Sequence, residues 1–236
     1  MTYAGSTTTQ LTGADARWPI SNQAAGGAAV ALGSLGILIT SVLYALSPPA
    51  ATLPAQPFDQ GLALAGAIAG ARTMYAAGTV GILSDIVMTV GVLLVMAELL
   101  RRGRGVAGAG WAAMVFSVVV FTLVDAMVGY VLAPVAAIKD GAAVFTGFKH
   151  LFDVLFLLGT LAFGAGALLA LSNDFASSAP LVSRPFALGG MLAGVAAMLS
   201  ASACFVGLPL EQGVGISIGV GSAVFAGIGL QIARAH

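Results

Sequence analysis

Ionisable residues gather in the stretch TGFKHLFDVLFLLGT, which contains Lys149, His150 and Asp153 but otherwise reads as a membrane helix. Asp85 and Asp125 interrupt two other apolar stretches in the same way. An ionised side chain deep in a membrane needs a partner, a water-filled cavity or neutralisation, so such residues mark functional sites. Carboxylic acids, a lysine and a histidine predict acid–base chemistry or proton-linked binding.

The elements that must position these residues are transmembrane helices. The chain has 236 residues, of which 59% are hydrophobic and 8% charged, and its mean hydropathy is +1.02. A soluble domain has about 25% charged residues, so the composition indicates an integral membrane protein. The apolar runs are continuous and long, which favours helices over the alternating strands of a membrane barrel. We therefore predict an all-α fold, with a polar tail over 1–23 and one transmembrane domain over 24–236.

Six spans are expected, at about 24–47, 73–100, 107–133, 143–171, 186–208 and 213–233. Prolines are expected at their edges, and the third span is predicted to end before Pro134. Residues 61–72 (GLALAGAIAGAR) are apolar but too short to cross a hydrocarbon core about 30 Å thick. They predict an interfacial or re-entrant helix, separated from the second span by a break near Gly70–Thr73.

Lysine and arginine in short loops predict the orientation. One side of the membrane receives Arg17, Arg101, Arg102, Arg104, Arg184 and Arg234, and the other receives Arg72 and Lys139. This bias favours both termini inside, in a multi-pass protein of a bacterial inner membrane. Glu98 precedes Arg101 and Arg102 by three and four residues, which predicts a solvated ion pair at the inner boundary.

Depth and helical periodicity place the ionisable residues together. At about 1.5 Å per residue, all of them fall between the outer surface and the midplane. Their stripes converge on a predicted polar pocket open to the outer side, with Tyr44 among the rim residues. The acid–base candidates are Asp85, Asp125, Asp153 and His150, and the ligand-binding candidates are Lys149, Tyr75, Thr89, Thr122, Tyr130 and Thr146.

A purely structural interpretation of the same residues stays open. Lys149 and Asp153, four residues apart, can pair on one helix, and His150 can be an interior histidine with satisfied hydrogen bonds. Asp85 and Asp125 can be protonated and each hold a neighbouring helix by a hydrogen bond.

Several classes of protein are disfavoured. A net charge of zero gives no indication of nucleic-acid binding. The only histidines are His150 and the last residue, His236, which are too few for a bis-histidine haem or a zinc site on several histidines, so the sequence predicts no metal site and no cofactor. A carboxylate site for a hard cation, with Asp85, Asp125 and Asp153 as ligands, stays open as an alternative. The expected partners are membrane lipids and a small-molecule or lipid ligand. Glycine-rich faces, including Gly215 and Gly219 four residues apart, predict close packing inside the bundle, a homodimer or a larger membrane complex.

Two stretches carry a resemblance. MAELLRRGRGVAGAGWAAMVF, and KHLFDVLFLLGTLAFGAGALLALS with the following SRPFALGGMLAGVAAML, resemble a bacterial family of six-helix integral membrane proteins with no assigned function. The resemblance covers about a third of the chain. It implies a six-helix bundle, and it implies neither an activity nor a functional residue.

Three functions agree with the sequence. The first is a membrane protein that binds a small or lipid-like ligand in an outer-half polar pocket, with transport coupled to a proton at Asp85 as one form. The second is a membrane-embedded enzyme in which aspartic acids isomerise or cyclise an apolar, isoprenoid-like substrate. The third is an accessory or scaffold subunit of a larger membrane complex.

Overall fold

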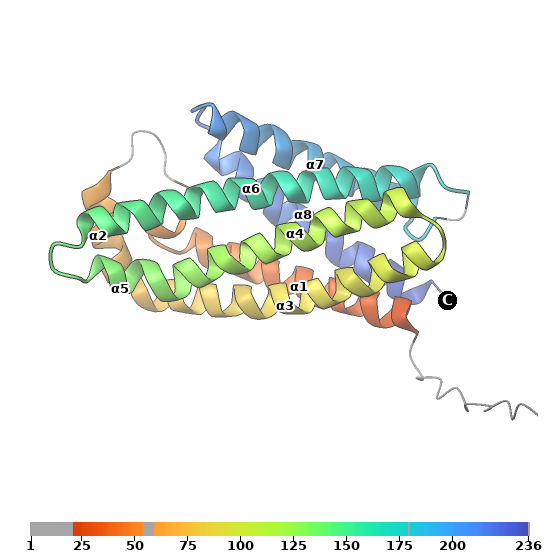
Figure 1. The fold of residues 1–236 in the computed structure, drawn as a ribbon, viewed down its shortest axis with the longest axis horizontal. Coiled ribbons are helices and arrows are strands. Elements are labelled where there is room, and N and C mark those ends of the chain that lie inside the picture. Colours follow the sequence, from red (N-terminus) through yellow and green to blue (C-terminus); the bar gives the residue numbers. More distant parts are fainter. Residues whose placement is uncertain (1–20, 54–58, 179, 236) are drawn as a thin grey trace, which may run out of the picture.

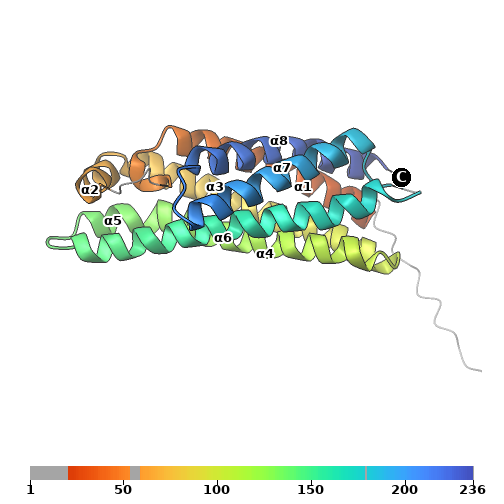
Figure 2. The same cartoon turned by 90° about the horizontal axis from the view of Figure 1, so that it is seen from above.

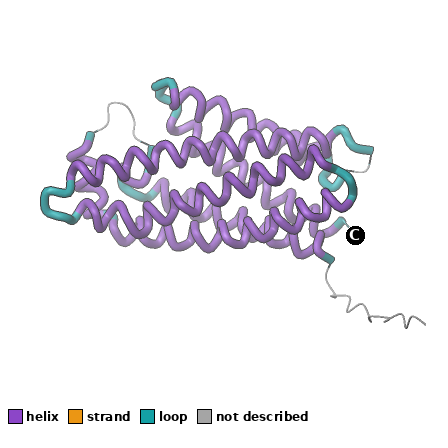
Figure 3. Tube along the Cα trace, in the orientation of Figure 1, coloured by secondary structure: helices purple, strands orange, loops and turns teal. Residues whose placement is uncertain are grey.

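A computed structural model of the protein describes residues 21–53, 59–178 and 180–235. Figure 3 shows helices joined by loops, and no strand occurs within these ranges. The helices are α1 (Asn22–Ala45), η1 (Pro49–Ala51), α2 (Gln60–Ala69), α3 (Ala71–Arg101), α4 (Gly105–Met127), η2 (Val128–Leu132), α5 (Ala133–Ala136), α6 (Ala142–Phe175), α7 (Arg184–Phe205) and α8 (Glu211–Arg234). Among them η1 is a 3-10 turn and η2 is a π turn.

Six helices in the described ranges are long and apolar enough to cross a membrane, with α4, η2 and α5 counted as one continuous rod. The chain therefore has the architecture of a multi-pass membrane protein, as its composition predicts. The 31 residues of α3 extend over roughly 46 Å at about 1.5 Å per residue. This exceeds a hydrocarbon core of about 30 Å, so α3 must tilt or reach into the headgroup region.

The long helices form a closed ring. Each packs against two neighbours, in the order α1, α3, α4, α6, α7, α8 and back to α1. All run along the long axis of the molecule (Figure 1), and Figure 2 shows α4 and α6 on one side of the bundle and α1 and α8 on the other. The ring order brings α3 and α4, which carry the two membrane aspartates, into direct contact.

Glycines let the helix backbones of the ring touch. A Cβ atom added to Gly27 on α1 would lie 2.4 Å from the backbone nitrogen of Ala233 on α8. One added to Gly229 would lie 2.4 Å from the backbone nitrogen of Ala31 on α1. Small residues at such crossings increase van der Waals contact, which drives helix association in lipid.

The short helix α2 is separate from α3, so the predicted break at Gly70 is confirmed. A Cβ atom on Gly70 would lie 2.5 Å from Cδ of Pro48, which shows how closely the end of α2 approaches the segment after α1. We keep the interfacial or re-entrant position of α2 as a prediction.

The predicted end of the third span before Pro134 is wrong. The helix continues through α5 to Ala136, with the proline in its first turn. A proline ring normally collides with the carbonyl four residues earlier, here that of Tyr130. The π turn η2 ends at Leu132, two residues before Pro134, and its wider spacing gives the ring room.

The bundle has two distinct ends. The termini end holds the start of α1, the end of α8 and the loops that follow α3 and α6, while the α2 end holds α2, η1 and the loop after α5 (Figure 1). The described arginines of the termini end are Arg101, Arg102, Arg104, Arg184 and Arg234.

Two large apolar clusters and a small third one around Leu157, Ala201 and Val214 fill the bundle. Toward the termini end, all six long helices contribute, with Trp111 of α4 and Phe225 of α8 packed edge to face across the ring at 6.3 Å. Toward the α2 end, η1 and α2 pack with α3, η2 and α6, around buried Phe145 and Phe152. The candidate site residues lie in and beside this second cluster.

Candidate functional site

The structure brings Asp85 and Asp125 together in the interior. Only 1% of Asp85 and 5% of Asp125 is exposed, and the two carboxyl groups interact directly. Gly81, one helical turn before Asp85, makes the space for this approach. A Cβ atom at Gly81 would lie 1.9 Å from Oδ2 of Asp125, so no larger residue fits there in this arrangement.

Tyr44 of α1 completes the group. Its hydroxyl donates a hydrogen bond to Oδ1 of Asp125, across 81 positions of sequence. The residue lies in the last turn of α1, which brings its phenol to the α3–α4 pair. The sequence places Tyr44 only at the rim of a pocket, so this contact with an aspartate is a finding of the structure.

Asp85 has an unsatisfied oxygen. Its Oδ2 is buried and has no hydrogen-bond partner among the described residues. The rest of the carboxyl group lies against Asp125 and Thr122. A buried polar atom without a partner costs free energy, and in a native protein it points to a functional role or to a bound species.

A second polar pair lies on α6. The Nζ atom of Lys149 forms an ion pair with Oδ1 of Asp153, and it lies 4.6 Å from the ring centroid of Phe152. Lys149 has no exposed surface, whereas the Asp153 side chain keeps 16%. The predicted i,i+4 pair is confirmed, with the ammonium turned inward instead of reaching toward the surface.

The two pairs are separate groups. No ion pair joins Lys149 to Asp85 or Asp125 within the described part of the chain. His150 is exposed on α6 and acts electrostatically on Asp153, so it does not share the interior with Lys149.

The other predicted ligand-binding residues are dispersed. Tyr75 and Tyr130 are exposed and pack edge to face at 5.2 Å, with the Tyr130 hydroxyl 2.9 Å from Oγ1 of Thr79. Thr146 accepts a 2.6 Å hydrogen bond from Nε2 of Gln60 at the start of α2. Thr89 is half-buried on α3, one turn beyond Asp85. Of the predicted ligand-binding set, the structure brings only Thr122 to the aspartates.

Two hollows lie at the termini end instead. One of about 10 Å³ is enclosed by apolar residues that include Leu99 and Trp111, with Asp174 at its wall. The other, open and of about 400 Å³, lies between the loop at Arg104 and the last turn of α6 at Asn173 with the residues that follow it. These hollows are far along the helices from Asp85, so they do not form the predicted pocket.

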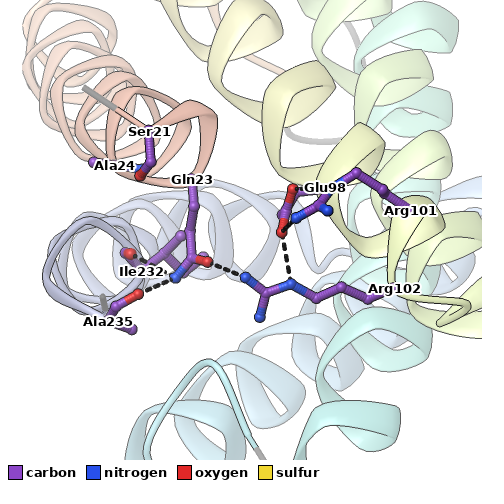
Figure 4. Close-up of polar contacts among 8 residues, drawn as sticks. All are labelled: Ser21, Gln23, Ala24, Glu98, Arg101, Arg102, Ile232 and Ala235. Carbon is purple, nitrogen blue, oxygen red and sulfur yellow. Dashed lines mark hydrogen bonds and ion pairs between the residues drawn. The ribbon is translucent and has the colours of Figure 1, made fainter. Parts of the chain in front are cut away.

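Figure 4 shows a polar network at the termini end. Glu98 accepts from Arg101 at 2.7 and 2.9 Å and from Nε of Arg102 at 2.6 Å, which confirms the predicted pairs. Glu98 itself is buried, so the network is less solvated than the sequence predicts. Arg102 also donates to Oε1 of Gln23 at 2.6 Å, and Gln23 donates to the backbone of α8 at Ile232. The network ties α1, α3 and α8 together.

Asp174 is a buried acidic residue that the sequence analysis does not single out. It forms an ion pair with Arg104 at 2.9 Å and accepts from the backbone nitrogens of Leu181 and Val182 at 3.0 and 2.8 Å. Asp174 lies 70 positions after Arg104 and just before a loop, so no helical periodicity in the sequence relates the two residues. The fold shows that Asp174 anchors the α6–α7 loop.

The chain matches no family model, no curated protein and no solved structure. The resemblance to six-helix bacterial membrane proteins thus implies the fold alone. Functional conclusions come from the side chains and their positions.

Proposed function

We propose that this chain is a multi-pass membrane protein that binds a small polar or lipid-like ligand near its α2 end, with a proton held by Asp85 and Asp125. The observation that carries the proposal is the buried Oδ2 of Asp85, which has no partner. A proton needs no cavity, and it removes one of the two negative charges and supplies a hydrogen bond between the carboxyl groups.

Electrostatics supports a proton in this place. Two negative charges in contact repel each other strongly where the dielectric constant is low, and neighbouring carboxyl groups then share a proton. Among the described residues, no three histidine, cysteine, aspartate or glutamate side chains are placed so that they could hold a metal ion together. The carboxyl pair is therefore better suited to a proton than to a metal ion.

Access to the pair is expected from the α2 end. Between Asp85 and Glu98 on α3 the interior is mainly the apolar cluster that includes Trp111 and Phe225. The buried titratable side chains of the described residues are Asp85, Asp125 and Lys149 toward the α2 end and Glu98 and Asp174 toward the termini end. The buried polar side chains between these two groups, such as Ser117, are hydroxyls that do not titrate. With the arginine-rich termini end on the inner side, the proton and the ligand would enter from the outer side.

The α6 pair supplies a second recognition element. Lys149 provides a buried cation beside Phe152, whose apolar cluster η1 and α2 cover at this end of the bundle, and the partly exposed Asp153 provides an anion next to it. A ligand that carries both charges, or a lipid headgroup, matches such a pair when the cover moves. Gln60 of α2, which donates to Thr146 and to the backbone oxygen of Ala142, would be released in that step.

Proton exchange tests this proposal directly. We expect the purified protein in neutral lipid vesicles to bind one proton per chain, reported by a pH-sensitive dye, that Asp85→Asn no longer binds. Asp140→Asn is the matched control, because Asp140 is exposed and its positive φ of 60° suits asparagine. If proton binding survives Asp85→Asn and Asp125→Asn unchanged, the proposed proton site is wrong. Mass spectrometry of molecules that copurify with the protein then identifies the ligand.

A second candidate function has a specific observation in its favour. The Lys149 ammonium is sealed by side chains, as in a pair that only stabilises the fold, and this favours an accessory subunit of a larger membrane complex. Such a subunit is expected to copurify with a defined partner in mild detergent. Isolation of a stable chain on its own, with a bound small molecule, would exclude this candidate.

A further inference from the structure

We propose that Tyr44 is a positioning residue that keeps Asp125 as the charged member of the pair, so that the exchangeable proton resides on Asp85. The inference rests on the proposed function, in that it assumes a proton on the pair and assigns its place. It follows from which oxygens of the two carboxyl groups have donors.

Oδ1 of Asp125 has a hydrogen-bond donor, whereas the buried Oδ2 of Asp85 has none. The Tyr44 hydroxyl has a single hydrogen, and it is directed to Oδ1 of Asp125. A hydrogen bond to a carboxylate favours its charged form. Oδ2 of Asp85 receives no hydrogen bond, so a charge on that carboxyl group would have less compensation.

Thr122 points to the same assignment. Its hydroxyl hydrogen is engaged by the backbone oxygen of Val118 at 3.0 Å, one turn earlier on α4. The Thr122 oxygen next to Asp85 is thus left as an acceptor, because a hydroxyl has one hydrogen to donate. An acceptor beside Asp85 suits a protonated acid, which donates a hydrogen bond, better than a carboxylate, which cannot.

The titratable groups facing the pair come from three helices. Tyr44 faces it from α1, while Asp85 and Asp125 belong to α3 and α4. On α6, Lys149 is paired with Asp153 and forms no ion pair with either aspartate. The balance between the two carboxyl groups is therefore set mainly by the Tyr44 hydroxyl.

Tyr44 also connects the pair to the cover at the α2 end. It packs in the same apolar cluster as Ala50 of η1 and Ala63 and Ala67 of α2. A ligand that displaces η1 and α2 would shift the end of α1 and weaken the bond to Asp125. Loss of that bond makes the charged form of Asp125 less stable, so ligand binding would let the proton move from Asp85 toward Asp125.

Infrared difference spectroscopy tests the assignment, because a protonated carboxyl group has its own C=O stretch. For the protein in lipid discs, the proton itself is the probe, and spectra are recorded as the pH is raised. We expect the band to disappear in Asp85→Asn and to persist in Asp125→Asn. Adding Tyr44→Phe to Asp85→Asn should bring back a protonated carboxyl band, now from Asp125, because that carboxylate has lost its hydrogen bond. Adding Tyr130→Phe, at an exposed tyrosine, to Asp85→Asn should bring back no band.

The outcomes separate this inference from the proposed function. A parent protein without any protonated carboxyl band would overturn the proton site as a whole. A band that is lost in Asp125→Asn and retained in Asp85→Asn would overturn only the assignment to Asp85. An Asp85→Asn spectrum that the added Tyr44→Phe leaves unchanged would remove Tyr44 from the positioning role. Phenylalanine keeps the ring of Tyr44, and thermal unfolding of each variant shows whether the bundle is intact.

Discussion

Gly81 of α3 lies directly against the carboxyl group of Asp125 of α4, so that a Cβ atom at position 81 would fall 1.9 Å from Oδ2. We expect Gly81→Ala to force the aspartates apart and to lower the free energy of unfolding by about 1–3 kcal/mol, a typical result of overpacking. Gly147→Ala is the control, since nothing lies within 4 Å of the added atom on α6. Thermal unfolding in detergent compares the two variants. Equal stabilities would show that the contact at Gly81 is not as close as described.

The sequence predicts the helices and the two aspartates of this site, but it does not predict the hydrogen bond from Tyr44. Apolar length alone locates the helices, and helical periodicity turns Asp85 and Asp125 toward the interior. The bond from Tyr44 depends on where α1 crosses α3, which is set by a tight contact of Gly33 with Met88. Such a crossing follows from the packing of two helices together. It leaves no periodic signal in either helix alone.

Buried charges on α6 give the second prediction. Asp153→Asn leaves the fully buried Lys149 ammonium without its ion-pair partner, and a broken buried pair typically costs about 3–5 kcal/mol. Lys149→Met leaves a carboxylate with some exposed surface, so we expect a smaller loss. The double variant should lose less than the sum of the two. Lys139→Met, at an exposed lysine, should change little. Additive losses in the double-mutant cycle would show that the two side chains do not stabilise each other.

The network at Glu98 predicts different roles for its two arginines. The Arg101 side chain is 74% exposed and contacts only Glu98 in the described network, so Arg101→Ala should destabilise the protein little. Arg102 is 43% exposed and also holds Gln23, which is bonded to the backbone of α8. We expect Arg102→Ala to destabilise the protein more than Arg101→Ala does. In a Gln23→Ala background, the two arginine variants should differ less in stability. Urea or thermal unfolding measures each variant. Identical losses for both arginines would disprove the link through Gln23.

Gly215 and Gly219 predict an oligomer contact on α8. Unlike the glycines of the ring, neither has an atom within 4 Å of an added Cβ, so their small face is open to the outside of the bundle. A second copy of the chain is the partner we propose for this face. In a Cys204→Ser background, Ile216→Cys should form cross-linked dimers under oxidation. Adding Gly219→Leu should suppress them at least several-fold. A cysteine replacing exposed Val144 of α6 is the control and should stay monomeric. Equal cross-linking at both positions would mean random collision.

Orientation is the last prediction, and it decides from which side the aspartates are reached. The described arginines cluster at the termini end, whereas the α2 end has Arg72 and Lys139, so the positive-inside rule puts the α2 end outside. In a Cys204→Ser background, Lys139→Cys in whole cells should react with a membrane-impermeant maleimide. Arg184→Cys should react only after the cells are broken. Both positions are exposed in the structure, so a difference in labelling reports the side of the membrane and not burial. The reverse pattern would place the Asp85–Asp125 pair in the inner half and make the inner side the source of its proton.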